Sequence, residues 1–382
     1  MVERRVPREI SAADGARRTG GMTPQPLRTV GSVARITEAA SERYGMLCLD
    51  RNERVSPLPP TVLNEIAAEL AIIDWTRYPN TDPIYEALCR FFGRRRDEVI
   101  LTPGSDGALR SLFQAFVGNG DAVVTVRPSY AMYEVYAALF GADVHAVDCD
   151  STLAVQVESI ASQIEAGVKL VLIANPNQPT GSLLTSDDIG VLLNRAADVG
   201  ALVVLDEAYA AFARCSAAEA FPEHPNLVVL QTFSKAWGLA GMRLGVALST
   251  QAVIAAMGAV RSVYDITAPS AAALRVVLSH ADAVYAYRDE VDAGREYLAE
   301  KMRSVGFHVF PTATNFMVIR TEPVIEPERL ISELCEAGIL IRGPFAHPSM
   351  AGCVRISLGP VDIMVRVVEA VHVILQRCQS SR

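Results

Sequence analysis

One lysine of the chain occurs where a chemically active amine would be expected. Lys235 follows Ser234 and precedes the apolar, glycine-containing run 236–242, which is not the usual setting of a solvated surface lysine. Burial in such a setting makes the amine a usable nucleophile and base. A lysine whose aliphatic stem lies along a loop while its amine stays in water would show the same pattern. Lys235 therefore needs partners before it indicates a function.

Polar side chains of other kinds follow two more apolar runs. Asp206, Glu207 and Tyr209 come directly after the run 201–205. An apolar strand that ends in Asp-Glu resembles the magnesium-binding strand of P-loop ATPases, but the chain contains no Gly-x-x-x-x-Gly-Lys-Ser/Thr segment. Residues 175–181, Asn-Pro-Asn-Gln-Pro-Thr-Gly, follow the earlier run 169–173. Their polar side chains between prolines are also typical of a rigid turn between a strand and a helix.

A turn of small residues could hold an anion. Residues 103–107 read Pro-Gly-Ser-Asp-Gly and are followed by a helical pattern. The free N–H groups and the dipole at the start of a helix favour a phosphate-sized anion. Such a turn is also an ordinary helix cap, so this motif alone is weak evidence.

These polar segments belong to a regular alternation of strands and helices. Helical patterns over residues 107–116, 131–140 and 187–199 separate several apolar runs. Strands that are apolar on both faces and alternate with helices are typical of an α/β fold with a mainly parallel sheet between helices. The seven predicted strands are 98–102, 122–126, 143–147, 169–173, 201–205, 227–230 and 244–248. Ligands of such sheets bind beyond the carboxyl ends of the strands, which is where the polar segments occur.

A smaller α+β domain, built from both ends of the chain, is predicted beside this sheet. Its later elements are a helix beyond about 293, strands near 307–309 and 315–319, a helix near 328–337, a strand at 353–358 and a helix over 363–376. Residues 1–30 lack the apolar core of a secretory signal, and we expect a disordered tail there, with a transit peptide as the alternative. The expected division is a segment 31–74 that contributes to the small domain, a large domain 75–290 and the small C-terminal domain 291–382.

Composition excludes several classes of protein. The 382 residues carry 35 Lys+Arg and 43 Asp+Glu, a formal net charge of −8, which argues against a surface that coats nucleic acid. No uncharged apolar stretch approaches the ~18 residues that span a bilayer. The seven cysteines form no Cys-x-x-Cys pair, and the six histidines show no metal-ligand spacing. We therefore expect a cytoplasmic protein with neither a metal site nor a disulfide framework.

The polar residues become informative as a set. A lysine, an aspartate, a tyrosine, an arginine (Arg243) and a phosphate-sized turn, each beside a predicted strand, are together what is needed to hold pyridoxal 5′-phosphate. That cofactor needs a lysine for a Schiff base, an acid at its pyridine nitrogen and a clamp for its phosphate.

The sequence resembles the fold-type I pyridoxal-phosphate-dependent aminotransferases (class I/II), most closely their histidinol-phosphate aminotransferase-like branch. Three motifs occur in the family's order: Asn-Pro-x-x-Pro-Thr-Gly at 175–181, Asp-Glu-Ala-Tyr at 206–209 and Ser-Lys-x(5)-Gly-x-Arg at 234–243. The resemblance extends from about residue 49 to about residue 358. It implies a large cofactor-binding domain, a smaller second domain and transfer of an amino group.

The resemblance assigns a role to each cofactor-binding position. Lys235 would bind the cofactor covalently and, once displaced by substrate, move a proton between the substrate Cα and the cofactor C4′. Asp206 would keep the pyridine nitrogen protonated, and Tyr209 would bond to the phenolic oxygen. The residues that would hold the phosphate are Ser105, Asp106, Ser234 and Arg243.

Two more tyrosines match positions of the family. Tyr130 would lie beside the cofactor ring, and Tyr78 would reach the phosphate of the neighbouring subunit. A homodimer with shared active sites is therefore implied. Where the family usually has Asn before Pro-Thr-Gly, this chain has Gln178. The resemblance leaves open whether Gln178 or the neighbouring Asn177 bonds to the cofactor's phenolic oxygen.

Three arginines are candidates for binding the substrate. Arg355 matches the arginine that holds the substrate α-carboxylate, for which a planar guanidinium is well suited. Arg342 matches a position that reads the far end of the substrate in phosphate-using members. Arg54 replaces a tyrosine or small polar residue of the family and is either a second contact to that end or a salt-bridged surface residue. Arg54 and Arg342 together would favour a substrate with a second anion.

The expected function is a ping-pong aminotransferase that acts on an L-amino acid and a 2-oxo acid. The cofactor motifs are equally compatible with a decarboxylase, an eliminase or a cyclase of the same fold in a specialised pathway. A cofactor-binding regulator would need a DNA-binding segment, and the chain has no basic helix-turn-helix pattern.

Overall fold

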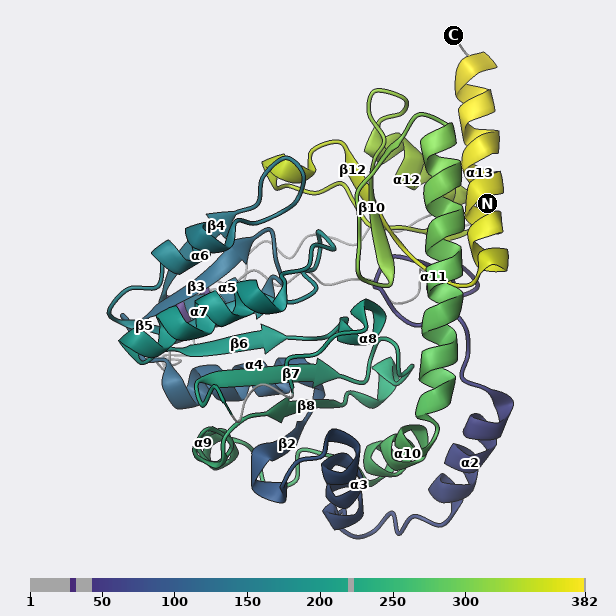
Figure 1. Ribbon diagram of the computed structural model, residues 1–382. Helices are drawn as coiled ribbons and strands as arrows, with labels where there is room; N and C mark the ends of the chain where they lie inside the picture. Colours follow the sequence, from purple (N-terminus) through teal and green to yellow (C-terminus); the bar gives the residue numbers. More distant parts are fainter. Residues whose placement is uncertain (1–27, 32–42, 219–222, 381–382) are drawn as a thin grey trace, which may run out of the picture.

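The computed structural model describes residues 28–31, 43–218 and 223–380 (Figure 1). The tail predicted for residues 1–30 lies outside the described residues up to residue 27, after which the short helix α1 (Arg28–Gly31) follows. Within the described ranges, no helix is both long enough and apolar enough to cross a membrane.

A seven-stranded sheet forms the larger part of the molecule. The strand order is β2-β8-β7-β6-β5-β3-β4. Strand β8 runs antiparallel to β2 and β7, and the other neighbouring strands pair in parallel. The strands are β2 (Val99–Thr102), β3 (Ala122–Arg127), β4 (Asp143–Asp148), β5 (Val168–Ala174), β6 (Leu202–Asp206), β7 (Leu227–Thr232) and β8 (Gly245–Leu248). All seven predicted strands and the predicted α/β fold class are confirmed.

Helices cover both faces of this sheet because successive strand residues point to opposite sides. Val203 packs into one apolar core and Val204 into the other. The second core contains residues of α4 (Gly104–Phe116), α5 (Met132–Phe140) and α9 (Gln251–Val260). The first contains residues of α2 (Pro60–Ala71), α3 (Asp82–Phe92), α6 (Val157–Ser162), α7 (Ser186–Val199), α8 (Ala210–Ala213) and α10 (Ala268–Ser279). Short 3-10 helices are η2 (Arg96–Glu98), η3 (Ala240–Met242) and η4 (Pro348–Met350).

The smaller domain joins both ends of the described chain, as predicted. Strands β12 (Cys353–Ser357), β10 (Phe316–Arg320) and β9 (His308–Val309) form an antiparallel sheet. Strand β1 (Leu47–Cys48) pairs with β11 (Ile339–Leu340). Neither of these two-residue strands was predicted, because two residues are too few to show a hydrophobic period. The helices of this part are α11 (Ala281–Ser304), α12 (Pro327–Glu336) and α13 (Val361–Ser380).

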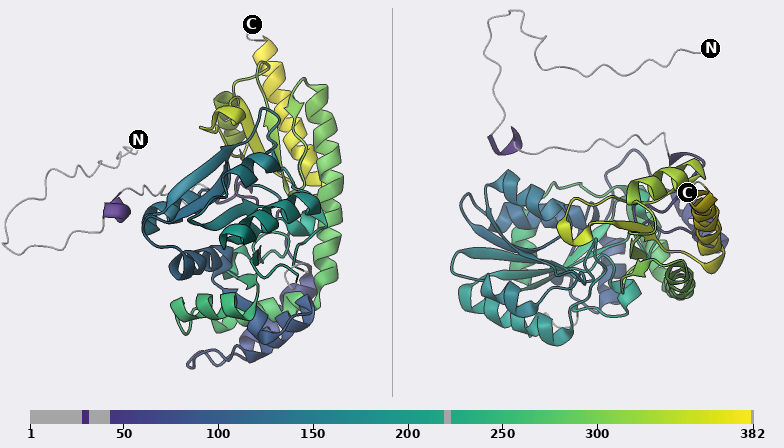
Figure 2. Two further views of the ribbon diagram at one scale, coloured as in Figure 1. Left: turned by 60° about the vertical axis from the view of Figure 1, so that its left-hand side comes forward. Right: turned by 90° about the horizontal axis from the view of Figure 1, so that it is seen from above.

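Helix α11 connects the two parts of the molecule. It begins at Ala281, well before the predicted residue 293, because buried residues occur at helical spacing at Val284, Tyr287 and Val291. It packs along α13 and extends past the large sheet (Figures 1 and 2). Helix α2, by contrast, packs against α10. The predicted boundary at residue 74 between the small-domain segment and the large domain stays a prediction.

Candidate active site

A cavity of about 250 Å³ lies where the two parts of the molecule meet. Most of its lining comes from one edge of the large sheet. We call these residues the sheet wall: Ser105, Asp106, Tyr130, Ala174, Gln178, Asp206, Ala208, Tyr209, Thr232, Ser234, Lys235 and Arg243. The remaining lining residues form the opposite wall: Arg51, Asn52 and Arg355.

Strand direction explains why the sheet wall assembles from distant parts of the sequence. The carboxyl ends of β2, β3, β5, β6 and β7 meet at one edge, because these strands are parallel to one another. Strand β8 runs the other way. Its amino end therefore reaches the same edge and brings Arg243, which precedes it, to the cavity.

Asp206 is a buried acid at the end of β6, with 5% of its surface exposed. The Tyr133 hydroxyl donates to its Oδ2 at 3.2 Å, and the Ala208 backbone N–H donates to its Oδ1 at 3.2 Å. Burial raises the pKa of Asp206 to about 6, against smaller opposing effects of these hydrogen bonds and of Lys235. The ionised carboxylate would therefore be stabilised by a cationic partner in the cavity.

Lys235 is half-buried and lies on the connection between β7 and β8. Its Nζ donates to the Arg51 carbonyl oxygen at 2.9 Å, across the cavity from its own strand. The same Nζ lies 5.8 Å from the centre of the Tyr209 ring. The lysine amine is thus held at the junction of the two walls.

The turn before α4 forms a cup whose shape depends on glycine. Gly104 has a φ of +74°, and a Cβ there would lie 2.9 Å from Arg243 Nη2. A Cβ on Gly245 would lie 2.2 Å from the Ser105 backbone nitrogen, closer than any side chain allows. The start of α4 can therefore approach β8 and place Ser105 beside Ser234 and Arg243 in the lining. Backbone N–H groups at a helix start together with an arginine suit a phosphate.

The opposite wall comes from two segments far apart in the sequence. The Asn52 backbone N–H donates to Ser357 Oγ of β12 at 2.9 Å, and Asn315 Nδ2 donates to the Asn52 carbonyl oxygen at 3.1 Å. The Asn52 side chain donates to the Tyr209 hydroxyl at 2.9 Å. Asn52 also has a φ of +54°, a left-handed conformation that Asn tolerates better than most residues. The chain therefore turns sharply at Asn52, and the bond from Asn52 to Tyr209 joins the opposite wall to the sheet wall.

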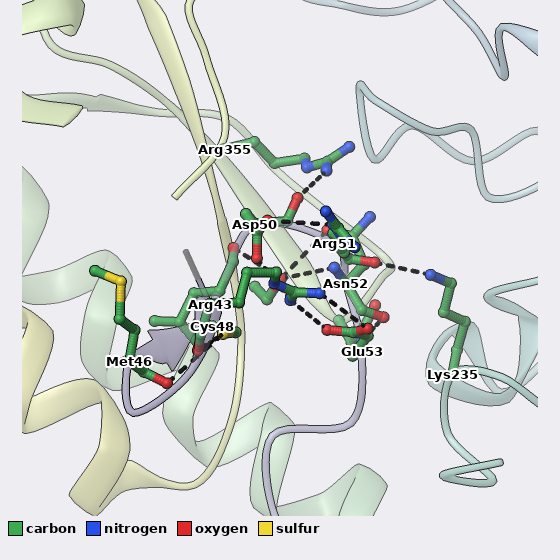
Figure 3. A network of polar contacts seen from close by, with 12 residues as sticks. Arg43, Met46, Cys48, Asp50, Arg51, Asn52, Glu53, Lys235 and Arg355 are labelled. Atoms are coloured by element: carbon green, nitrogen blue, oxygen red, sulfur yellow. Dashed lines mark hydrogen bonds and ion pairs between the residues drawn. The ribbon is translucent and has the colours of Figure 1, made fainter. Parts of the chain in front are cut away.

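Arg355 completes the opposite wall from the middle of β12. It is 5% exposed, and its Nη2 donates to the Asp50 carbonyl oxygen at 2.8 Å (Figure 3). Its Nε is buried without a hydrogen-bond acceptor among the described residues. Burial lowers the pKa of Arg355, and the nearby charge of Arg342 lowers it further. A buried guanidinium of this kind is suited to an anionic ligand.

Four predicted site residues do not line the cavity. Asn177 is buried beside it, where its amide bonds to the Pro128 carbonyl and to Thr180. Arg342 is exposed and bonds through its backbone to Arg355. Arg54 lies with its guanidinium 3.9 Å from the centre of the Tyr287 ring and donates to the Ala236 carbonyl oxygen. Tyr78 is 74% exposed and stacks on Tyr264.

Sequence reasoning missed several residues of the site. Arg51 and Asn52 line the cavity instead of the predicted Arg54, although all belong to one short segment. Tyr133 lies one helical turn beyond Tyr130 and bonds to Asp206, and this i, i+3 spacing is the signal that could have revealed it. The further lining residues Ala174, Ala208 and Thr232 are small and lie directly at strand ends.

Comparison with known proteins identifies the family. Residues 45–371 match the family described as aminotransferase class I and II. The chain belongs to this family. It is 35% identical over 335 residues to a histidinol-phosphate aminotransferase from Roseiflexus castenholzii, covering 84% of this chain and 89% of the relative. It is 34% identical over 313 residues to one from Thermococcus gammatolerans, covering 81% and 86%.

A solved structure shows the same fold for an aminotransferase. The histidinol-phosphate aminotransferase from Sinorhizobium meliloti, in complex with pyridoxal 5′-phosphate, superposes with a TM-score of 0.85 at 24% identity. The match covers 94% of this chain and all of that chain. The family match and the two relatives show that the protein is a pyridoxal-phosphate-dependent aminotransferase of the histidinol-phosphate aminotransferase-like branch, with amino-acid and 2-oxo-acid substrates.

The residues of the cavity fit pyridoxal 5′-phosphate. The cup at Ser105, with Ser234 and Arg243, suits its phosphate, and Lys235 is an amine within the same cavity. The buried Asp206, whose pKa burial raises, matches a protonated ring nitrogen. The cup, the lysine and the buried acid were all predicted from the sequence, and the structure places them in one cavity.

Proposed function

We propose that this aminotransferase acts on an amino substrate whose anionic group binds Arg355, with histidinol phosphate as the first candidate. The observation that carries the proposal is that Lys235, Asp206 and Arg355 line one cavity although they belong to three distant segments. The names of the relatives in two organisms support histidinol phosphate. In that compound a phosphate ester stands where an amino acid has its carboxylate, and a guanidinium binds either group.

The side chains of the sheet wall would then divide the work. The bound cofactor supplies an electron-withdrawing ring next to the reacting carbon. Lys235 would accept the proton from the substrate Cα and return it at the cofactor C4′. Asp206 would hold the ring nitrogen in its protonated form, and Tyr209 and Gln178 would orient the phenolic oxygen. The phosphate cup would keep the ring at a fixed depth in the cavity.

Arg355 would orient the substrate for this proton transfer. Its guanidinium is held by the Asp50 carbonyl oxygen at 2.8 Å, so an anion bound to it has a defined position relative to Lys235. Fixed geometry of this kind is what allows one substituent of Cα to react rather than another. The aminotransferase names of the relatives favour transamination over decarboxylation, elimination or cyclisation.

A single-turnover experiment tests the proposed substrate. The purified holoenzyme is mixed with histidinol phosphate, histidinol or L-glutamate, and conversion of the cofactor to its amine form is followed by absorbance. We expect conversion by histidinol phosphate and L-glutamate at rates at least about tenfold above histidinol, which lacks an anion for Arg355. Release of carbon dioxide or ammonia without this conversion would contradict the proposal and indicate one of the alternative reactions.

We also propose that two copies of the chain form a homodimer with shared active sites. A group of large apolar side chains is exposed on the connection between α2 and α3 and on the segment after α9. Its members are Ile72, Trp75, Tyr78, Val263 and Tyr264. Trp75 is 69% exposed, and the rings of Tyr78 and Tyr264 stack with centroids 4.0 Å apart. An exposed apolar patch of this kind is typical of a protein interface. Tyr78 would reach the phosphate cup of the second copy.

The oligomeric state tests this interface. Trp75→Glu places a charge in the patch, and we expect sedimentation to show monomers where the wild type forms dimers. Val373→Glu on α13 makes the same kind of change at an exposed valine of the smaller domain and should leave the dimer intact. Monomeric wild-type enzyme with full cofactor affinity would contradict the shared site.

We infer a cytoplasmic location from the cysteines of the sequence, seven in number and without paired spacing. Fractionation of cells that express the full chain, with a cytoplasmic and a secreted marker enzyme, tests this location. Recovery of the protein with the secreted marker would contradict it.

A further inference from the structure

Arg54 is a candidate site residue that is half-buried but does not line the cavity. Its Nη1 donates to the Ala236 carbonyl oxygen at 3.0 Å, and its Nε donates to the Ser56 carbonyl oxygen at 3.1 Å. Its guanidinium carbon lies 3.9 Å from the centre of the Tyr287 ring. The guanidinium is therefore fixed by three protein groups, outside the space that a substrate enters.

One of these groups, the Ala236 carbonyl oxygen, belongs to the residue directly after Lys235. The loop between β7 and β8 also has backbone bonds of its own, such as the bond from the Gly238 N–H to the Lys235 carbonyl oxygen at 3.2 Å. Arg54 adds a bond from a segment 182 positions earlier in the sequence. The backbone beside Lys235 is thus held by its own loop and by the segment that carries the opposite wall.

The loop after Lys235 also packs closely on the aliphatic stem of Arg54. Gly238 has a φ of +73°, and a Cβ there would lie 2.9 Å from Arg54 Cδ and 3.2 Å from Leu58 Cδ2. Only glycine combines this backbone conformation with so close an approach. The stem of Arg54 therefore contacts the same loop to which its guanidinium bonds.

The other side of Arg54 is fixed by helix α11. Tyr287 of this helix is 1% exposed, and its hydroxyl accepts a hydrogen bond from the Val55 backbone N–H at 3.0 Å. The Arg54 guanidinium lies over the same ring. A planar guanidinium can stack on a ring and donate from its edge at the same time, whereas an ammonium has no plane to stack. Arg54 thus joins α11 to the loop of Lys235 in a way that depends on its residue type.

Two hydrogen bonds of different kinds connect the loop of Lys235 to the segment that carries the opposite wall. One runs from Lys235 Nζ to the Arg51 carbonyl oxygen at 2.9 Å (Figure 3), and the other from Arg54 Nη1 to the Ala236 carbonyl oxygen. Under the proposed function the amine carries a proton between two atoms, so its bond to the Arg51 carbonyl oxygen has to break in each cycle. The bond of Arg54 uses no reacting group and can persist. It is the connection that can hold the loop while the amine moves.

We propose that Arg54 is a positioning residue for Lys235. It acts through the Ala236 carbonyl oxygen and keeps the backbone beside the lysine at a constant distance from the opposite wall, where Arg355 would hold the substrate. The amine then meets the substrate Cα in the same geometry in each turnover. The inference rests on the proposed roles of Lys235 and Arg355, and it gives Arg54 no contact with substrate or cofactor.

Single-turnover kinetics test this role with Arg54→Met, which keeps the stem and removes the donors. The amino donor is the member of the panel above that reacts fastest with the wild type, prepared with hydrogen and with deuterium at Cα. We expect the maximal rate to fall about tenfold to a hundredfold, and the donor concentration at half-maximal rate to change less than about twofold. Because a misplaced amine slows the proton transfer itself, the isotope effect should rise. Arg54→Lys, which keeps the charge, should recover part of the rate, and it takes the place of Arg54→Met if that variant does not fold.

Arg96 offers a matched control away from the cavity. Its guanidinium carbon lies 3.3 Å from the centre of the Tyr85 ring, and its Nη1 donates to the Val99 carbonyl oxygen at 3.5 Å. Arg96→Met therefore removes the same two kinds of contact and should leave the rate and the isotope effect unchanged. An equal kinetic loss in Arg96→Met, or a loss in Arg54→Met with an unchanged isotope effect, would overturn the inference and show only a general loosening of the fold.

Hydrogen–deuterium exchange of the full chain without cofactor gives a readout that does not depend on activity. Peptides that cover residues 234–242 should exchange faster in Arg54→Met than in the wild type and in Arg96→Met. Unchanged exchange there would overturn the inference, because Arg54 would then not hold the loop. Full rate in Arg54→Met would overturn the inference and leave the proposed function intact. A wild type that converts no donor of the panel would overturn both.

Discussion

The sheet wall and the opposite wall of the cavity are each stabilised by a different kind of hydrogen bond. Neighbouring strands of the sheet wall pair through backbone hydrogen bonds, and two apolar cores pack against them. The opposite wall depends on side chains instead, since Ser357, Asn315 and Arg355 each bond to the backbone of residues 50–52. A single substitution can therefore move the opposite wall, whereas the sheet wall keeps its geometry. Under the proposed function, cofactor chemistry would belong to the stable wall and substrate choice to the adjustable one.

The largest effect is expected at the sheet wall, from removal of its amine. Lys235→Ala should abolish the visible absorption of the bound cofactor and lower kcat by about ten-thousandfold, the upper range for a general acid–base residue. Lys301→Ala on α11, where Lys301 pairs with Glu300 and lies over the Tyr297 ring, is the matched control and should leave kcat unchanged. Steady-state kinetics and absorbance spectra check both variants. Retained turnover in Lys235→Ala would remove the central assumption about this wall.

The next largest effect concerns the buried acid. Asp206→Asn keeps the shape of the side chain but cannot hold the ring nitrogen protonated, and we expect kcat to fall about a hundredfold to a thousandfold. Tyr133→Phe, which removes only the hydroxyl that bonds to Asp206, should cost much less. Equal losses in the two variants would mean that the hydrogen bond, rather than the charge of Asp206, matters.

Asp206 also makes the cofactor-free chain sensitive to pH. Its pKa in the folded chain is about 6, above its ordinary value of 3.8. The folded chain therefore binds this proton more tightly than the unfolded chain, and its stability falls as the pH rises from about 4 to about 6. Above pH 6 the loss levels off at roughly 3 kcal/mol. Urea unfolding should show Asp206→Asn more stable by about this amount at pH 8 and equal to the wild type below pH 4.

Sequence reasoning could reach the sheet wall because each of its side chains follows a strand. Asp206 and Lys235 lie just past apolar runs, and the parallel arrangement brings such positions together. The opposite wall depends on contacts between residues 305 positions apart, such as Asn52 with Ser357, which no local pattern contains. The left-handed turn at Asn52 lies between Arg51, which lines the cavity, and Arg54, which contacts the Tyr287 ring.

Asn52 is the position at which the opposite wall can be weakened most. Asn52→Ala loses the hydrogen bond to Tyr209 and places a Cβ residue at a φ of +54°. We expect the free energy of unfolding to fall by about 2 to 3 kcal/mol, from the lost bond and the left-handed backbone. Asn52→Gly loses the same bond without the steric cost and should fall by only about 1 kcal/mol. Equal values in chemical denaturation would show that the turn at Asn52 has no role.

The smallest effect separates two neighbouring amides of the sheet wall. Gln178 lines the cavity, whereas the Asn177 amide donates to the Pro128 carbonyl oxygen at 3.0 Å and to Thr180 Oγ1 at 2.8 Å. Asn177 cannot turn toward the cofactor without losing both bonds. Gln178→Ala should therefore weaken cofactor binding about fivefold, the value of one hydrogen bond, at unchanged melting temperature. Asn177→Ala should lower the melting temperature and leave the cofactor dissociation constant within about twofold. The reverse pattern in absorbance titrations and thermal melts would place the cofactor contact at Asn177.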